Sequence, residues 1–261
     1  MNFLYRAGEK MTWTQAIVLC LAGALLVPTL LVGPSGPPGT ATQTEPYVPV
    51  PPNWTAIAAW PPVEAAFISA RPDPNRRVTA IVLDDSGSMG GDMEAAKASV
   101  VEALNAMSAT DRVAVLGLNS GTILSFVDVA EARTALPLAI RPIESSGGTP
   151  LTPAMRAAQD LLEAEAAMAR GFGTFRMIVT TDGVADEPDA LRATVEDIAR
   201  RTPIQITTIG IGIGGNHVLR RSALGQFVDI SNVEAMGQAL QAAVAENNDF
   251  IAITDFAETG D

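Results

Sequence analysis

Short apolar runs rich in β-branched residues alternate with amphipathic helical segments along the last two thirds of the chain. The runs lack polar alternation, which is typical of strands that are buried on both faces of a sheet. The expected strands are 78–83, 112–118, 175–181 and 204–211, with a shorter one at 227–230. Strands that alternate with helices imply parallel crossover connections. The sequence therefore predicts an α/β fold, in which a doubly wound, mostly parallel sheet is flanked by helices.

The segments between these strands place apolar residues three or four positions apart, as amphipathic helices do. A short helix near 130–136 is expected to stop at Pro137, because proline breaks a helix interior. The segment 122–126 follows the turn signal Asn119-Ser120-Gly121, which indicates a hairpin with the strand before it. The other expected helices are 92–107, 153–166, 189–201 and 233–244.

Oxygen-bearing side chains stand where two of the expected strands end. Asp84, Ser86 and Ser88 follow the strand 78–83, and Asp182 follows the strand 175–181. Open α/β sheets bind ligands at the carboxyl ends of their strands. Carboxylate and hydroxyl oxygens suit hard divalent cations, and the sequence has no cluster of His and Cys that would suit zinc.

The run LDDSGSM resembles the DxSxS signature of von Willebrand factor A domains, with Asp84, Ser86 and Ser88 at the matching positions. Members of that family complete a metal ion-dependent adhesion site with a threonine after a Gly-Gly pair and an aspartate at a strand end. Here SSGGTPL offers Thr149 and VTTDGVAD offers Asp182. The resemblance implies that these five residues bind Mg²⁺, with Mn²⁺ or Ca²⁺ as alternatives. It also implies that an Asp or Glu carboxylate of a partner protein completes the coordination.

Each site residue has a structural alternative as well. Asp84 and Ser88 could cap the next helix, Thr149 could belong to a turn, and Asp182-Gly183 could form an ordinary turn. The resemblance covers roughly 78–244, and three motifs in the expected order favour the metal site over these alternatives.

Asp85 occupies the variable position of the motif and is expected to face solvent, and His217, the single histidine, is expected at the surface. Ser88 lacks a nucleophile elbow because Ser86 stands at its first glycine position, so we do not expect an enzyme. The alternatives are a module that the metal only stabilises and, less favoured, a metal-assisted hydrolase.

The uncharged apolar run 16–32 is close to the length of about 20 residues that spans a bilayer. Arg6 and Lys10 precede it and the next basic residue is Arg71, so the positive-inside rule puts the N-terminus in the cytoplasm. The rest would lie on the extracytoplasmic side, which is the periplasm if the source is a Gram-negative bacterium. A cleaved signal peptide and a buried core helix are the alternatives. The single cysteine, Cys20, excludes an intrachain disulfide.

Composition divides the chain into four parts. We expect a transmembrane anchor at 1–33, a Pro-rich linker at 34–75, the α/β domain at 76–246 and a C-terminal tail at 247–261. Eleven of the 18 prolines fall in the linker, which predicts an extended, semi-rigid spacer. The tail contains FIAITDF, which could be an added strand or a mobile segment.

The chain is strongly acidic, with a formal net charge of −12. Nucleic-acid backbones would be repelled by such a surface, so nucleic acid is excluded as the expected partner. The partners that remain are a cation, an unknown protein and, through the N-terminal run, a membrane.

Overall fold

A computed structural model describes residues 51–62, 73, 75–215, 217–221 and 224–245. All of them fall within one unit of the chain, 48–261. The expected anchor at 16–32 and the tail at 247–261 lie outside the described residues. Among the described helices, none combines the length and the apolar character that a bilayer crossing requires.

Six strands form one sheet in the order β3-β2-β1-β4-β5-β6. The pair β2–β3 is antiparallel, and the other four neighbouring pairs are parallel. This confirms the mostly parallel sheet and the hairpin. The strands are β1 (Arg77–Leu83), β2 (Arg112–Gly117), β3 (Gly121–Asp128), β4 (Thr174–Thr181), β5 (Gln205–Ile211) and β6 (Gln226–Ile230).

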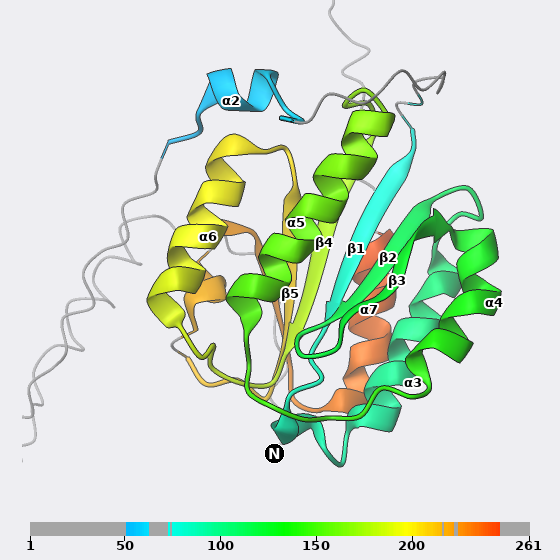
Figure 1. Ribbon diagram of the computed structural model, residues 1–261. Coiled ribbons are helices and arrows are strands. Elements are labelled where there is room, and N and C mark those ends of the chain that lie inside the picture. Colours follow the sequence, from blue (N-terminus) through cyan, green and yellow to red (C-terminus); the bar gives the residue numbers. More distant parts are fainter. Residues whose placement is uncertain (1–50, 63–72, 74, 216, 222–223, 246–261) are drawn as a thin grey trace, which may run out of the picture. The chain divides into compact units, whose positions relative to one another are not determined.

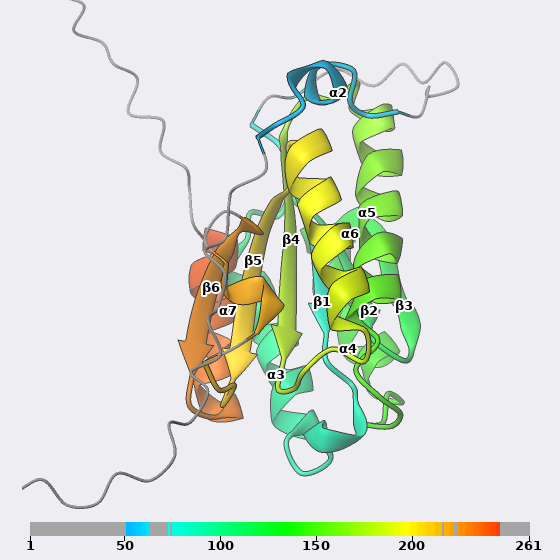
Figure 2. The same ribbon diagram turned by 90° about the vertical axis from the view of Figure 1, so that its left-hand side faces the viewer.

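Helices cover both faces of the sheet (Figure 1, Figure 2). One face carries α3 (Met93–Ala103), α4 (Val129–Ile140) and α7 (Met236–Ala245). The other carries α5 (Leu151–Met168) and α6 (Pro188–Arg201). Successive strand side chains point to opposite faces. Ile81 and Leu83 of β1 accordingly join the α3–α4–α7 core, while β1 itself is buried along almost its whole length.

The prediction that a helix stops at Pro137 is wrong. α4 runs through this proline to Ile140, with Pro137 inside the helix. Proline removes one helical hydrogen bond. The helix nevertheless continues because Leu136 and Ile140, on either side of the proline, are both buried in the core.

Part of the expected linker contributes structure to this unit. Residues Trp54–Ala58 form α2, whose N-cap residue Asn53 donates its backbone N–H to the carbonyl of Arg200 at 2.8 Å. Trp60 packs edge-on against Phe175 at the start of β4, with 4.8 Å between ring centroids. Both contacts lie at the end of the sheet opposite the carboxyl ends of β1 and β4 (Figure 1).

Candidate metal site

The carboxyl end of β1 holds a buried aspartate. Asp84 has no exposed surface, and its backbone N–H donates to Thr180 Oγ1 on β4 at 3.0 Å. Its Oδ1 accepts the N–H of Ser86 at 2.9 Å, and its Oδ2 accepts the N–H of Asp182 at 3.1 Å. Two backbone donors from two loops therefore fix the direction of this carboxylate.

Two serine hydroxyls join Asp84 to the loop after β4. Ser86 Oγ lies 3.0 Å from Ser88 Oγ, and Ser88 Oγ donates to Asp182 Oδ1 at 2.7 Å. Ser86 is buried, whereas Ser88 is exposed. The two hydroxyls thus lie in a row between the carboxylates of Asp84 and Asp182, and the Ser88 end of the row is exposed to solvent.

The loop before α5 brings the third part of the candidate site. A Cβ atom placed on Gly183 would lie 3.5 Å from Thr149 Oγ1, so this hydroxyl stands beside the residue that follows Asp182. The backbone N–H of Thr149 donates to Asp186 Oδ1 at 3.0 Å, and the N–H of Asp186 donates to the Thr149 carbonyl at 3.2 Å. All three loops named by the sequence therefore meet at one edge of the sheet.

The electrostatics of the site favour a bound cation. Burial raises the pKa of Asp84 above its usual value, and the nearby charge of Asp182 raises it further. Hydrogen bonds from Ser86 and from the Asp182 backbone act in the opposite direction. The buried Asp84 carboxylate is costly to ionise beside Asp182, and a divalent cation bound between the two would stabilise its charged form.

The donor set consists of hydroxyl and carboxylate oxygens, which suit a hard divalent cation. Ser86, Ser88 and Asp182 form a row in which neighbouring oxygens are 3.0 Å and 2.7 Å apart. The part of the chain that the structure describes has no group of three or more His, Cys, Asp or Glu side chains placed to hold a metal. A cation here would therefore need the hydroxyls.

Two expectations about neighbouring residues are wrong. Asp85 does not face solvent, because its side chain is fully buried under the turn between β2 and β3. His217 is only 6% exposed, because its Nδ1 accepts the N–H of Leu219 at 3.2 Å and caps a short helical turn. Burial, followed by the charge of Arg220, lowers the pKa of His217.

Two residues that hold the site together were not identified from the sequence. Asp186 bonds Thr149 in both directions, and Asn119 donates its side-chain amide to the Gly148 carbonyl at 3.0 Å. Asn119 was named only as part of a turn signal, and Asp186 stood only as the last residue of VTTDGVAD. The signal for their contacts was the Gly147-Gly148 pair, whose lack of side chains indicates a close approach.

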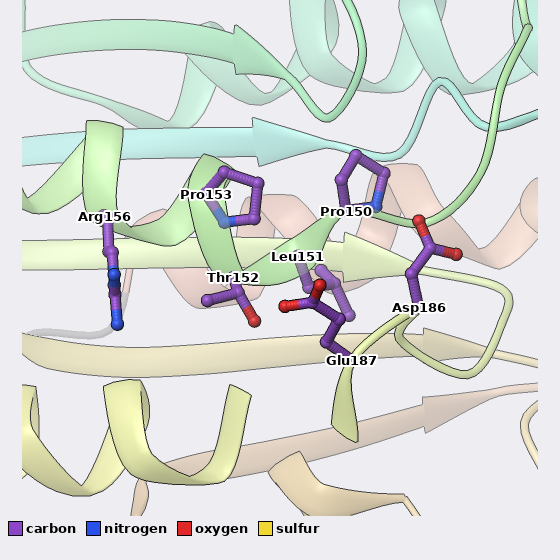
Figure 3. A pocket seen from close by; sticks show the side chains of 7 residues that line it. All are labelled: Pro150, Leu151, Thr152, Pro153, Arg156, Asp186 and Glu187. Carbon is purple, nitrogen blue, oxygen red and sulfur yellow. The ribbon is translucent and has the colours of Figure 1, made fainter. Parts of the chain in front are cut away.

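A pocket of about 340 Å³ lies beside the Thr149 loop. Figure 3 shows Asp186 and Glu187 on the loop that leads to α6, facing the first turns of α5. The pocket therefore combines acidic, basic and apolar surface next to the candidate site. Its lining consists of Pro150, Leu151, Thr152, Pro153, Arg156, Asp186 and Glu187.

Solved structures share the fold of this chain at low sequence identity. A von Willebrand factor type A protein from Catenulispora acidiphila is 19% identical, with a TM-score of 0.56, over 66% of this chain and 42% of that one. The pilus adhesin SpaC from Lactobacillus rhamnosus GG is 16% identical, with a TM-score of 0.54, over 66% and 30%. Proximal thread matrix protein 1 from the mussel byssus is 14% identical, with a TM-score of 0.52, over 65% and 47%. This chain thus spans less than half the length of each of these three structures.

The family comparison concerns the part of the chain that holds the five candidate ligands. No curated protein matches the sequence. Residues 79–184 match the family model of the von Willebrand factor type A domain, which confirms the resemblance carried by LDDSGSM. These matched residues run from β1 to the loop after β4 and include all five candidate ligands. Residues 79–184 are therefore similar to the von Willebrand factor type A domain, and the chain shares the fold of the solved structures above.

Proposed function

We propose that this domain binds one divalent cation, Mg²⁺ by preference, and uses it to capture a carboxylate of a partner protein. The ligands would be Asp84, Ser86, Ser88, Thr149 and Asp182. The single observation that carries the proposal is the chain of contacts from Asp84 through the two serines to Asp182, because it aligns oxygen donors from separate loops at an open edge.

The choice of cation follows from the charge and hardness of the donors. Two carboxylates neutralise one divalent ion, and neutral hydroxyls add no further charge. Oxygen donors suit Mg²⁺, with Mn²⁺ and Ca²⁺ as weaker alternatives on the same chemistry. The cation would supply a positive charge at a surface that is otherwise acidic. The chain's own residues would fix its position through the backbone bonds to Asp84.

The surroundings of the site suit a protein partner. Val184, two residues after Asp182, is 66% exposed, so an apolar side chain stands at the rim. The pocket between α5 and the loop to α6 is lined by Pro150, the residue that follows Thr149. A partner that offers an Asp or Glu to the cation would place its flanking residues on this mixed surface. One solved structure of the same fold is a pilus adhesin, which is consistent with this role.

Catalysis is not favoured by the contacts of the candidate nucleophile. Ser88 donates to Asp182, and the single histidine of the chain uses its Nδ1 to accept a backbone N–H. A serine nucleophile of the Ser–His type needs the imidazole within hydrogen-bond reach, and the Nδ1 of His217 accepts the N–H of Leu219. The stronger alternative is that the cation only stabilises the fold and captures no partner. A cation bound by the same three loops would hold them together in that case as well.

We further propose that 1–33 anchor the chain in a membrane as a single pass and that 34–75 act as a spacer. The domain would then lie on the extracytoplasmic side. The uncharged run 16–32 and the positions of Arg6 and Lys10 support this topology. Alkaline extraction of membranes and protease treatment of intact spheroplasts test it. A domain that resists protease until the cells are lysed would place it inside and reject the topology.

Affinity capture from a membrane extract tests the function. The full chain in detergent should retain a partner in Mg²⁺ and release it in EDTA, and Asp84→Ala should retain none. Amidation of the extract's carboxyl groups with a carbodiimide and an amine should abolish capture. Capture that persists in EDTA would contradict the proposal. A melting temperature that rises with Mg²⁺, without any capture, would select the structural alternative.

A further inference from the structure

Asp85 is a buried carboxylate that points away from the candidate ligands. Its Oδ1 accepts the backbone N–H of Asn119 at 2.7 Å. Its Oδ2 accepts the backbone N–H of Ser120 at 3.0 Å and the Ser120 hydroxyl at 2.5 Å. A Cβ atom on Gly117 would lie 2.4 Å from Oδ2, so the glycine leaves room for this carboxylate. Asp85 thus holds the β2–β3 turn against the end of β1.

Asn119 extends this contact to the loop that carries Thr149. Its side-chain amide lies 3.4 Å from Asp85 Oδ1 and donates to the Gly148 carbonyl at 3.0 Å. A Cβ atom on Gly147 would lie 2.5 Å from Asn119 Oδ1, and Gly147 has a φ of 75°. The absence of a side chain at 147 therefore lets Asn119 reach the carbonyl of Gly148, the residue before Thr149.

The backbone of the first loop bonds the same segment directly. The N–H of Ser146 donates to the Asp85 carbonyl at 2.8 Å, and the N–H of Gly87 donates to the Gly147 carbonyl at 3.1 Å. Asp85 therefore contacts the Thr149 loop through its main chain and, through Asn119, by its side chain. From the other side, Asp186 would lie 2.6 Å from a Cβ on Gly148.

From these contacts we infer that Asp85 is a positioning residue, which sets the Thr149 hydroxyl at the cation site by orienting Asn119 against the Gly148 carbonyl. This inference deepens the proposed function and rests on it. Asp85 does not ligate the cation, since both of its oxygens are directed to the β2–β3 turn. A carboxylate suits this role because its two oxygens accept hydrogen bonds, and four donors surround it here.

Calorimetric titration of the full chain with Mg²⁺ tests the contacts that lead from Asp85 through Asn119 to Gly148. Asn119→Ala removes the link to Gly148 but leaves the backbone donors on Asp85. We expect a loss in affinity of about 10–100-fold, the usual effect of removing a group that orients a metal ligand. Ser120→Ala is the matched control, because it removes one bond to Asp85 that does not lead to Gly148. It should bind Mg²⁺ as the wild type does.

A double-mutant cycle shows whether the effect acts through Thr149. If it does, Asn119→Ala should add no further loss in a chain that already carries Thr149→Ala. Losses that multiply, or an Asn119→Ala chain that binds Mg²⁺ as tightly as the wild type, would overturn the inference.

Hydrogen exchange of the metal-free protein gives a second readout that does not depend on the cation. The amides of Ser146 and Thr149 should exchange faster in Asp85→Asn and Asn119→Ala, while amides of β1 and β4 keep their protection. Unchanged exchange at both loop amides would overturn the positioning role. If the wild type takes up no Mg²⁺, the proposed function fails, and the exchange experiment still decides the positioning role.

Discussion

Ser88 Oγ donates a 2.7 Å hydrogen bond to Asp182 Oδ1, although the two residues lie 94 positions apart in the chain. The bond joins the loop after β1 to the loop after β4, two strands that are neighbours in the sheet. Because the carboxyl ends of parallel strands meet at one edge, residues distant in sequence become candidate ligands of one ion.

Replacing the half-buried carboxylate of Asp182 separates metal binding from folding. Asp182→Asn keeps an oxygen that can accept the Ser88 hydroxyl but removes one charge. At [Mg²⁺] about 100 times the Kd, binding should stabilise the wild type by about 2.7 kcal/mol, which raises Tm by roughly 5–10 °C. Differential scanning calorimetry should show this rise in the wild type and lose it in Asp182→Asn.

The same variant should be at least as stable as the wild type in EDTA, because the charge of Asp182 raises the pKa of the buried Asp84. A lower Tm of Asp182→Asn in EDTA would mean that Asp182 has a structural role. A full Mg²⁺ response in this variant would exclude Asp182 as a ligand.

Protons should compete with the cation at Asp84. Burial, followed by the charge of Asp182, raises the pKa of this carboxyl above 3.8. A cation binds the ionised form, so the apparent affinity should be constant above the raised pKa and fall by about tenfold per pH unit below it. Titration of Mg²⁺ at a series of pH values measures this slope. A pH-independent affinity across that range would contradict Asp84 as a ligand.

In the metal-free protein, the contribution of Asp84 to the unfolding free energy should decrease as pH rises. The native state holds the Asp84 proton more tightly than the unfolded chain. Its contribution to the unfolding free energy is therefore fully present below pH 3.8 and is lost as pH rises through the folded pKa. Denaturant titrations in EDTA, with Asp84→Ala as the comparison, isolate this contribution.

His217 should make folding sensitive to mild acid. Burial, followed by the charge of Arg220, lowers its pKa from 6.5, so its contribution is present above pH 6.5 and is lost as pH falls through the folded pKa. His217→Asn keeps a side-chain acceptor for the Leu219 N–H but does not titrate. Unfolding free energies of the two chains should diverge on acidification. Parallel curves would show that His217 is not the cause.

Adding a single methyl group at Gly148 should destabilise the fold and weaken Mg²⁺ binding. A Cβ on Gly148 would lie 2.6 Å from Asp186 Oδ2, so Gly148→Ala must displace the carboxylate that bonds Thr149. We expect a cost of about 1–3 kcal/mol in unfolding free energy and weaker Mg²⁺ binding. Gly91→Ala is the matched control, because no atom lies within 4 Å of its Cβ. Equal behaviour of the two variants would show that the close approach does not matter.

The sheet and the candidate ligands could be predicted because both follow from local patterns. A short apolar run such as 78–83 is typical of an inner strand of a parallel sheet, which is buried on both faces. The residues that follow the carboxyl ends of neighbouring strands, Asp84 and Asp182, then lie at one edge of the sheet. Asp85 could not be assigned from the sequence, since its burial depends on the turn at Asn119 that folds over it. The passage of α4 through Pro137 likewise reflects core packing on both sides of the proline, which local propensity does not contain.

Isothermal titration of the full chain with Mg²⁺ in detergent, beside Asp182→Asn, measures the central claim most directly. A cation held by Asp84, Ser86, Ser88, Thr149 and Asp182 should bind at one ion per chain, with binding lost in the variant. If the wild type shows no saturable binding at millimolar Mg²⁺, Mn²⁺ or Ca²⁺, or if Asp182→Asn binds equally well, these oxygens do not form a cation site.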